Sequence, residues 1–218
     1  MKRVALLGAE STGKSQLAVE LAQHLCAQGL RAVAVGEVLR EWCTREGREP
    51  RPEEQVAIAQ EQERRTDQAA GVADIVIADT TALMVAIYSG MLHEDGPLLR
   101  FALQRQKGYD ATLLAGLDLP WTPDGLHRDA SHPREDVDAL VRSLLQRAQV
   151  PFQVVYGQGP RRRDSAVQAL VSAGVLPPAM GDGPRDAGAA RPWVWACDKC
   201  SDPACEHRLF ARLREGRG

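Results

Sequence analysis

A run of eight residues near the start of the chain has the composition and spacing of a phosphate-binding loop. Residues 8–15 read Gly-Ala-Glu-Ser-Thr-Gly-Lys-Ser, which matches the pattern G-x-x-x-x-G-K-S. Its glycines let the backbone curl so that successive N–H groups point at one anion. We expect Lys14 to reach the β- and γ-phosphates of ATP, and the Ser15 hydroxyl to bind Mg²⁺. The predicted nucleotide site comprises Gly8, Glu10, Ser11, Thr12, Gly13, Lys14 and Ser15.

The residues on either side of this loop have the pattern that such a site requires. An apolar run of strand length, Val4–Leu7, leads directly into the loop. Apolar side chains then recur at helical spacing from Leu17 to Leu25. A helix at this position adds the partial positive charge of its N-terminus to the anion site. The alternative is a glycine-rich turn that fits the pattern by chance, and it explains neither the strand pattern before the loop nor the helical pattern after it.

A carboxylate ends the third apolar run of the chain. Residues 74–79 read Asp-Ile-Val-Ile-Ala-Asp, a pattern typical of a buried strand. In enzymes with a phosphate-binding loop, an aspartate at this end of a strand holds Mg²⁺. Asp79 is therefore predicted to be a metal ligand. The alternative is that Asp79, Thr80 or Thr81 caps the helix predicted over residues 82–91.

Charged residues also follow the second apolar run, Ala32–Val35. Glu37, Arg40 and Glu41 lie at helical spacing and would share one face. Ligands of open α/β sheets bind beyond the carboxyl ends of the strands, which favours contact of these side chains with an acceptor substrate. A surface ion pair on an ordinary helix is the alternative. Glu37 and Asp79 are the two candidates for a general base, and the sequence does not choose between them.

An irregular segment follows the fourth apolar run. Two prolines and a glycine interrupt residues 117–129. Arg128 and Arg134 are predicted to close over ATP, where they would neutralise charge on the transferred phosphoryl group. Trp121 offers an aromatic face to a heterocyclic substrate; alternatively, it anchors the loop against the core.

The last part of the chain contains residues that bind metals. Cys197, Cys200, Cys205 and His207 form the pattern C-x₂-C-x₄-C-x-H. Three thiolates and one imidazole suit tetrahedral Zn²⁺. An iron–sulfur cluster on the three cysteines and a reduced tail without metal are the alternatives. Because few apolar residues accompany the pattern, we expect this tail to fold only with metal, and we consider it a candidate contact for a protein partner.

Short apolar runs alternate with helical patterns along most of the chain. Five runs are predicted to be strands: Val4–Leu7, Ala32–Val35, Asp74–Ala78, Ala111–Ala115 and Phe152–Tyr156. The clearest helical pattern spans residues 134–148, and a last one covers Ser165–Ser172. This alternation predicts an α/β fold of the P-loop NTPase type, with three layers and a five-stranded parallel sheet.

Composition divides the chain into three parts. Residues 1–173 form the predicted P-loop kinase-like domain, residues 174–192 a Gly/Pro-rich linker, and residues 193–218 the small Cys-rich tail. Within the first part, residues 51–70 are strongly polar and helical. We interpret them as a solvated or lid helix.

The overall composition narrows the function classes. A formal net charge of −2 over 218 residues argues against general binding to nucleic acid or anionic membranes. Arginine supplies most of the positive charge, so scattered arginines are given little functional weight. The sequence shows neither a signal peptide nor a span-length apolar run, which predicts a cytoplasmic protein outside the membrane. It also contains no asparagine, and so it lacks the N-K-x-D guanine-binding motif of regulatory GTPases.

Four segments together resemble one known family. They are G-A-E-S-T-G-K-S, the E-x-x-R-E after the second strand, the I-A-D-T after the third, and D-x-P-W-x-x-D-G-L from Asp118. Over residues 1–172 the chain resembles the P-loop kinases that include the ribosylnicotinamide kinase domain of NadR. The resemblance implies ATP- and Mg²⁺-dependent phosphorylation of the 5′-hydroxyl of nicotinamide riboside, with Trp121 and Asp124 near the acceptor. The chain departs from the family at His127, where an arginine is usual, and Arg128 follows one place later.

The expected function is therefore that of an ATP-dependent small-molecule kinase, acting on nicotinamide riboside or a related riboside or nucleoside. The alternative is a non-kinase ATPase that works as a switch or within a complex, with the zinc-binding tail as its interaction segment. ATP turnover without a phosphorylated small molecule would favour that alternative.

Overall fold

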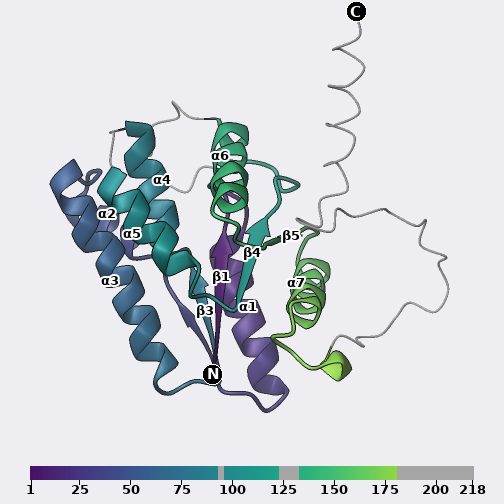
Figure 1. Ribbon diagram of the computed structural model, residues 1–218. Coiled ribbons are helices and arrows are strands. Elements are labelled where there is room, and N and C mark those ends of the chain that lie inside the picture. Colours follow the sequence, from purple (N-terminus) through teal and green to yellow (C-terminus); the bar gives the residue numbers. More distant parts are fainter. Residues whose placement is uncertain (93–95, 123–132, 181–218) are drawn as a thin grey trace, which may run out of the picture.

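A parallel β-sheet forms the centre of the computed structural model, which describes residues 1–92, 96–122 and 133–180 (Figure 1). Its strands are β1 (Lys2–Leu7), β2 (Ala32–Val35), β3 (Ile75–Asp79), β4 (Ala111–Ala115) and β5 (Gln153–Val155). The order across the sheet is β2-β3-β1-β4-β5, so β1 lies in the middle. It pairs with β3 from Lys2 and Ile75 onward, and with β4 from Val4 and Ala111 onward. The predicted α/β fold with a five-stranded parallel sheet is confirmed.

Helices connect the strands, as parallel pairing requires, because each strand must return to the same end of the sheet. Their bounds are α1 (Lys14–Ala27), α2 (Val38–Glu46), α3 (Pro52–Ala70), α4 (Ala82–Leu92), α5 (Gly96–Gln106), α6 (Arg134–Arg147) and α7 (Pro160–Ser172), with a short 3₁₀ turn at Pro178–Met180.

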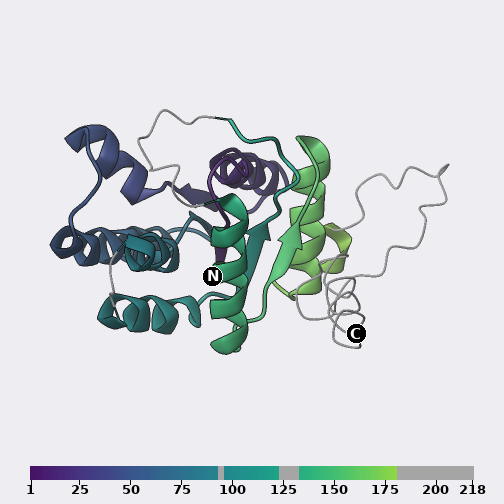
Figure 2. The ribbon, with the colours of Figure 1, turned by 90° about the horizontal axis from the view of Figure 1, so that it is seen from above.

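Both faces of the sheet are covered by helices. Along β1, Val4 and Leu6 pack with side chains of α1 and α7, whereas Ala5 and Leu7 pack with those of α4 and α6. Figure 2 shows α1 and α7 on one side of the strands and α6 on the other. All four β1 side chains are fully buried. A strand that is buried on both faces must be apolar throughout, which explains the uninterrupted run in the sequence.

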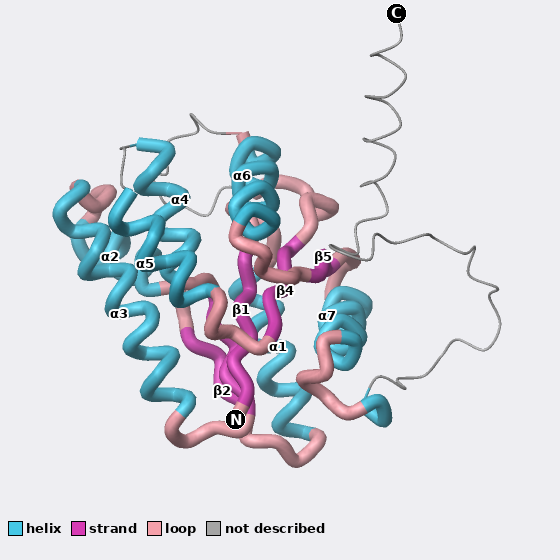
Figure 3. Tube along the Cα trace, in the orientation of Figure 1, coloured by secondary structure: helices cyan, strands magenta, loops and turns pink. Residues whose placement is uncertain are grey.

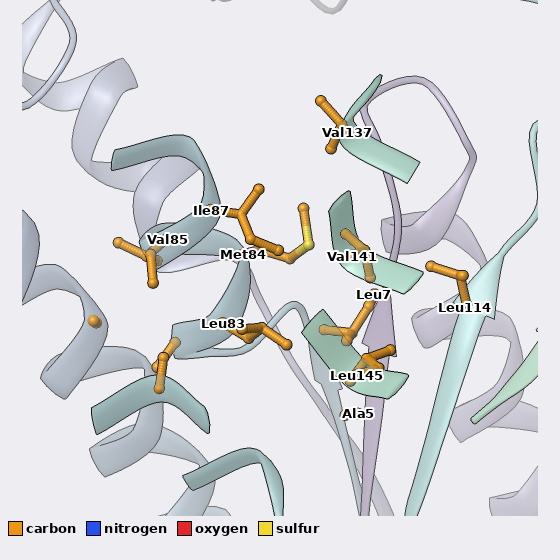
Figure 4. Packing of buried hydrophobic residues seen from close by; sticks show 14 of the residues in the cluster. Ala5, Leu7, Leu83, Met84, Val85, Ile87, Leu114, Val137, Val141 and Leu145 are labelled. Carbon is orange, nitrogen blue, oxygen red and sulfur yellow. The ribbon is translucent and has the colours of Figure 1, made fainter. Parts of the chain in front are cut away.

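The largest hydrophobic cluster lies between the sheet and the helices α4 and α6. Figure 4 shows Leu83 and Met84 of α4 facing Val141 and Leu145 of α6, with Leu7 of β1 between the two α6 residues. These five side chains are at most 1% exposed. The α4 segment is apolar on nearly all sides because it is enclosed by α3, α5 and α6. This packing holds α4 in place and so holds the carboxyl end of β3, which immediately precedes α4 in the sequence.

The helix predicted over residues 51–70 is confirmed by α3, but its interpretation as a solvated or lid helix is wrong. In α3, Ile58 and Ala59 are buried in the main cluster, and Gln62 and Glu63 are at most 3% exposed. The two polar side chains are buried because they bond to backbone groups of neighbouring elements. The buried face of α3 was not evident from its polar composition, because the groups that bond to Gln62 and Glu63 are distant in sequence.

Smaller differences concern element boundaries. The last helix begins at Pro160 instead of Ser165, and β5 is shorter than Phe152–Tyr156. The helix α5 is one that the apolar pattern did not single out. At the start of the predicted linker, Leu176 is 4% exposed and packs with the α1–α7 cluster.

All five strands have their carboxyl ends at one edge of the sheet, which is the upper edge in Figure 3. The segments that leave this edge include the loop before α1, the turn before α2 and residues 116–122 after β4. No helix in the described part of the chain is both long and apolar enough to cross a membrane.

Candidate functional site

The loop between β1 and α1 has the backbone conformation of an anion-binding turn. Gly8, Ser11 and Gly13 have positive φ angles of 143°, 52° and 73°. Gly8 has no space for a side chain, because a Cβ atom would lie 3.0 Å from the carbonyl oxygen of Ala115. The helix α1 begins at Lys14, so its first N–H groups, which have no partner within the helix, are turned toward the loop. The local geometry is that of a phosphate site.

Two side chains close this loop on itself. Thr12 Oγ1 and Lys14 Nζ each donate to the carbonyl oxygen of Ala9, both at 2.7 Å. Thr12 is fully buried and Lys14 is 6% exposed. The ammonium group of Lys14 is therefore held inside the loop that would surround a phosphate, as the sequence motif predicts.

An open cleft of about 480 Å³ lies against the loop. Four segments line it: residues 11–16, Arg40 of α2, the residues Leu119, Pro120 and Thr122 after β4, and Gln158 with Gly159 after β5. Its volume is within the range of small-molecule sites. Of the predicted nucleotide residues, Gly8 and Glu10 belong to the loop but are outside this lining, and Ser11 to Ser15 form part of it. The Ser11 hydroxyl also donates to the Thr122 carbonyl at 2.5 Å.

Asp79 ends β3 beside the loop. The Asp79 residue is 4% exposed, and the nearby Ser15 hydroxyl acts on the pKa of its carboxyl. Within the described residues, Asp79 Oδ1 has no hydrogen-bond partner. Burial raises the pKa of the Asp79 carboxyl above its usual range, and the charge of Glu37 adds to the rise, while Ser15, Lys14 and Arg40 oppose it. A buried carboxylate with an unsatisfied oxygen is prepared to receive a cation.

The capping alternative for this region applies to Thr81 and not to Asp79. Thr81 Oγ1 accepts an N–H group in the first turn of α4 at 3.2 Å, and Glu63 Oε1 accepts the N–H of Ala82 at 3.0 Å. Thr80, which lies between Asp79 and Thr81 in the sequence, has a φ of 67°, which is unusual for a β-branched residue. Strained backbone of this kind clusters at functional sites. Asp79 is thus left facing the phosphate-binding loop.

The residues present fit a Mg²⁺ ion that binds together with a nucleotide. Magnesium is usually held by one or two carboxylates together with phosphate oxygens and waters. Asp79 supplies the carboxylate, with its unpartnered Oδ1, and Ser15 supplies a hydroxyl. In residues 1–92, 96–122 and 133–180, no three side chains of His, Cys, Asp or Glu gather to hold a metal by themselves.

Glu37 is buried at the start of α2, at 5% exposure. Its Oε2 accepts a hydrogen bond from Arg40 Nε at 3.2 Å, and Arg40 lines the cleft. The pair is therefore not an ordinary surface ion pair, because the Glu37 carboxylate is buried. This carboxylate is also close enough to Asp79 to raise the pKa of the Asp79 carboxyl. Two of the three residues predicted after β2 lie next to the nucleotide loop.

The amide of Gln62 in α3 holds the backbone on both sides of Glu37. Its Oε1 accepts the N–H of Val38 at 2.8 Å, and its Nε2 donates to the carbonyl of Gly36 at 3.2 Å. Gln62 is fully buried. The conformation of the turn that presents Glu37 thus depends on a residue far away in the sequence.

We expect Gln62→Leu to lower the free energy of unfolding by about 2 kcal/mol, because it leaves the buried N–H of Val38 unsatisfied and removes the bond to the carbonyl of Gly36. Urea denaturation measures the change. The control Gln60→Leu, at an exposed position of the same helix, should change it by less than about 0.5 kcal/mol. Equal effects of the two substitutions would contradict the role given to Gln62.

Two other residues predicted to contact substrate lie outside the cleft lining. Glu41 Oε2 forms an exposed ion pair with Arg65 Nη1 at 2.6 Å. Trp121 is 55% exposed and so does not anchor its loop against the core. Its ring is left accessible to a ligand, as the first interpretation of this residue requires.

Arg134 supports the segment after β4. Its Nη1 donates to the Leu119 carbonyl at 3.1 Å, and its Nη2 donates to the same oxygen and to the Leu117 carbonyl. Leu119 is part of the cleft lining, so Arg134 acts on the cleft through the backbone of this segment. Its predicted closure over ATP stays a prediction. The predicted residues Asp124, Arg128, Cys197, Cys200, Cys205 and His207 lie outside the described residues.

Sequence reasoning missed the contribution of the segment after β5. Gln158 and Gly159 line the cleft, and Arg162 of α7 is 3% exposed and bonds to the carbonyl of Thr12 at 2.9 Å. Arg162 stands within Arg161-Arg162-Arg163, which resembled the general arginine bias of the chain. The buried positions of α7, Ala166, Val167 and Leu170, lie at helical spacing from Arg162, and this was the one available signal.

Comparisons with known proteins agree with this geometry. A family model described as an AAA domain (AAA_28) matches residues 3–162. A comparison with curated proteins found no match.

Several solved structures share the fold. The crystal structure of NadR in complex with NAD and AMP-PNP superposes with a TM-score of 0.64 at 18% identity, over 80% of this chain and 50% of the NadR chain. A NadR complex with NR gives 0.63 at 18% identity, over 79% and 49%. Deoxyadenosine kinase from M. mycoides gives 0.55 at 14% identity, over 78% and 99%. The chain thus spans about half the length of the NadR structures that it resembles.

Proposed function

This chain belongs to the AAA domain family, and from that premise we propose that it is an ATP- and Mg²⁺-dependent kinase of nicotinamide riboside or a related riboside. The observation that carries the proposal is the placement of two buried carboxylates, Asp79 and Glu37, beside a phosphate-binding loop. The fold shared with NadR, which was solved with NR, and with deoxyadenosine kinase supports a small-molecule acceptor.

The two carboxylates suit different tasks. Asp79 is buried near the Ser15 hydroxyl and its Oδ1 has no partner among the described residues, so we assign it to Mg²⁺. Glu37 lies at the turn after β2, where acceptor substrates of open α/β sheets bind, and we assign it as the general base. Mg²⁺, when bound, neutralises charge on the β- and γ-phosphates.

The proposed reaction transfers one phosphoryl group. The 5′-hydroxyl oxygen of the riboside forms a bond to the γ-phosphorus, the bond between that phosphorus and the bridging oxygen of ADP breaks, and the hydroxyl proton passes to the Glu37 carboxylate. Lys14 and the N–H groups of the loop hold the triphosphate and stabilise its developing charge. Arg40, bonded to Glu37, orients that carboxylate at the rim of the cleft.

A screen of acceptors tests the function. Purified protein is incubated with ATP, Mg²⁺ and either nicotinamide riboside, adenosine or deoxyadenosine, and the products are identified by mass spectrometry. We expect nicotinamide riboside to gain one phosphoryl group. If ATP is consumed and none of the acceptors is modified, the kinase proposal is wrong and the chain is an ATPase. If only another nucleoside is modified, the substrate assignment is wrong and the reaction class is retained.

Glu37→Gln tests the assignment of the base. We expect kcat to fall about 100-fold, because the amide cannot accept the hydroxyl proton, while KM for ATP changes by less than about threefold. Initial-rate kinetics over a range of ATP and riboside concentrations measure both quantities. Glu46→Gln, an exposed substitution at the end of α2, is the matched control and should leave kcat unchanged. A kcat of Glu37→Gln equal to that of the control would remove Glu37 from the mechanism.

The cysteine-rich tail is proposed to bind one structural Zn²⁺ through Cys197, Cys200, Cys205 and His207. Metal analysis of protein produced with zinc supplied tests this part. A metal content near zero would exclude the zinc site without affecting the kinase proposal.

A further inference from the structure

Arg162 of α7 joins three loops at the edge of the sheet where the nucleotide cleft lies. Its Nη2 donates to the carbonyl of Thr12 at 2.9 Å and to that of Gly116 at 3.2 Å. Its Nη1 donates to Asp118 Oδ1 and to the carbonyl of Gly157, both at 2.9 Å. The four oxygens belong to the phosphate-binding loop, the segment after β4 and the segment after β5. The side chain of Arg162 is 4% exposed, so these bonds are shielded from water.

The bond to Thr12 has a direct consequence for the phosphate site. A trans peptide is planar, so its C=O and N–H groups point in opposite directions. Because Arg162 holds the carbonyl of Thr12, the N–H of Gly13 is aimed the opposite way, away from the guanidinium. Gly13 has a φ of 73° and lines the cleft. Arg162 thereby fixes the orientation of the Gly13 N–H, which is a donor of the anion site, without entering that site.

Asp118 extends this connection to the segment after β5. Its Oδ2 accepts the N–H of Gly157 at 2.6 Å, while its Oδ1 accepts from Arg162. The next two residues, Gln158 and Gly159, line the same cleft as the phosphate-binding loop. One ion pair thus links two of the segments that line the cleft.

We propose that Arg162, together with Asp118, is a positioning residue that aims the phosphate-binding loop and fixes its separation from the segment 157–159. The inference rests on the proposed binding of ATP at this loop and does not depend on the identity of the acceptor. In this role Arg162 acts through protein oxygens, to which both of its Nη groups donate. Its Nε has no hydrogen-bond partner among the described residues.

Arginine is suited to this role in a way that lysine is not. A guanidinium presents its donors in a planar fork and can bond to several oxygens at once, whereas an ammonium is a single point charge on a flexible stem. Arg162→Lys therefore keeps the charge beside Asp118 but loses part of the set of four bonds. We expect the loss to appear in the affinity for polyphosphate.

Isothermal titration of Arg162→Lys and of the natural protein with ATP, AMP and inorganic tripolyphosphate, in the presence of Mg²⁺, tests the proposal. We expect Kd for ATP and for tripolyphosphate to rise by the same factor, about 10- to 100-fold, and Kd for AMP to change less than about threefold. The number of sites per chain should stay near one, because a positioning defect lowers the affinity of every site and does not remove sites. A merely structural role would lower the fraction of active protein and leave Kd unchanged in the folded fraction.

Arg163→Lys is the matched control, since Arg163 is the next residue of α7 and pairs with Asp164. Asp118→Asn is the second variant, because its side chain is 31% exposed and its substitution should leave the fold intact. If Arg162→Lys does not fold, a rise of about threefold or more in the Kd of Asp118→Asn for tripolyphosphate supports the proposal, and an unchanged Kd overturns it. An Arg162→Lys variant that folds and binds tripolyphosphate as tightly as the control also overturns it. Failure of the natural protein to bind ATP would instead refute the proposed function.

Discussion

Lys14→Ala is expected to lower kcat/KM for phosphoryl transfer about 10³-fold, which corresponds to ~4 kcal/mol of transition-state stabilisation. Lys14 is the cation that the phosphate-binding loop holds at its centre, through a 2.7 Å hydrogen bond from Nζ to the Ala9 carbonyl. A γ-phosphate in the cleft would replace that carbonyl as its partner. Alanine removes this charge from a site that is shielded from water, and no shift of a neighbouring side chain restores it.

Initial rates with the acceptor identified in the screen measure this loss. Lys107→Ala is the matched control, because Lys107 is exposed just after α5, and its kcat/KM should equal that of the natural protein. Thermal unfolding of both variants separates loss of chemistry from loss of folded protein. A Lys14→Ala enzyme with more than about a tenth of the natural kcat/KM would exclude the loop as the site of phosphoryl transfer.

Asp79→Asn is expected to reduce kcat about 10³-fold and, in the absence of nucleotide, to raise the free energy of unfolding at pH 7. The first effect follows from loss of the carboxylate assigned to Mg²⁺. The second follows from burial, which raises the pKa of Asp79, so that its ionised form is disfavoured in the folded state. An asparagine of nearly the same shape has no charge to bury.

The pH dependence has a definite sign. Because the folded pKa of Asp79 lies above its unfolded value of about 3.9, the folded chain binds more protons between the two values. Stability contributed by this group is therefore present below about pH 4 and is lost as the pH rises through the folded pKa. The stability advantage of Asp79→Asn should accordingly be largest at neutral pH and vanish toward pH 4. Urea denaturation without nucleotide at a series of pH values measures it.

Asp74, just before the same strand, provides a control of opposite sign. The hydrogen bond from Arg31 lowers the pKa of Asp74 to about 2. Asp74→Asn should therefore lower stability at neutral pH, and the difference should disappear as the pH falls from about 4 toward 2. If Asp79→Asn behaved as Asp74→Asn does, the carboxylate of Asp79 would be stabilised in the fold, and its assignment as a strained cation ligand would be wrong.

The sheet and the nucleotide loop were predictable because their signals are local. An apolar run followed by G-x-x-x-x-G-K-S specifies a strand, a turn and a helix in one continuous segment, and β1 and α1 follow that pattern over residues 2–27. One topological rule, that carboxyl ends of parallel strands share an edge, predicts that Glu37, Arg40 and Asp79 lie near this loop. In the structure Asp79 ends β3 and Arg40 lines the cleft, while the functional roles of the three residues stay predictions.

Positioning residues were not predictable in the same way. Gln62 and Arg162 are polar, and their residue types do not separate them from the exposed glutamines and arginines around them; for Arg162 only the spacing to apolar residues of the same helix offered a signal. Both are buried because the backbone groups they bond come from loops that are distant in sequence. A hydrophobic pattern does not predict such contacts, because it indicates which positions are buried and not which polar groups bond to a buried side chain. Glu41 shows the opposite error, because its helical spacing is right but it pairs with Arg65.

The central place of β1 has a consequence for how the protein is made. The phosphate-binding loop is synthesised before the segments that hold it: β1 pairs with residues 75–79 and 111–114, and the carbonyl of Thr12 is held by Arg162, 150 residues further on. Contacts of such long sequence separation form late and slowly. A nascent chain can therefore contain the whole nucleotide motif and have no means of retaining ATP. The capacity to bind nucleotide would then arise only when the last helix of the sheet domain has docked, so that binding reports completed folding.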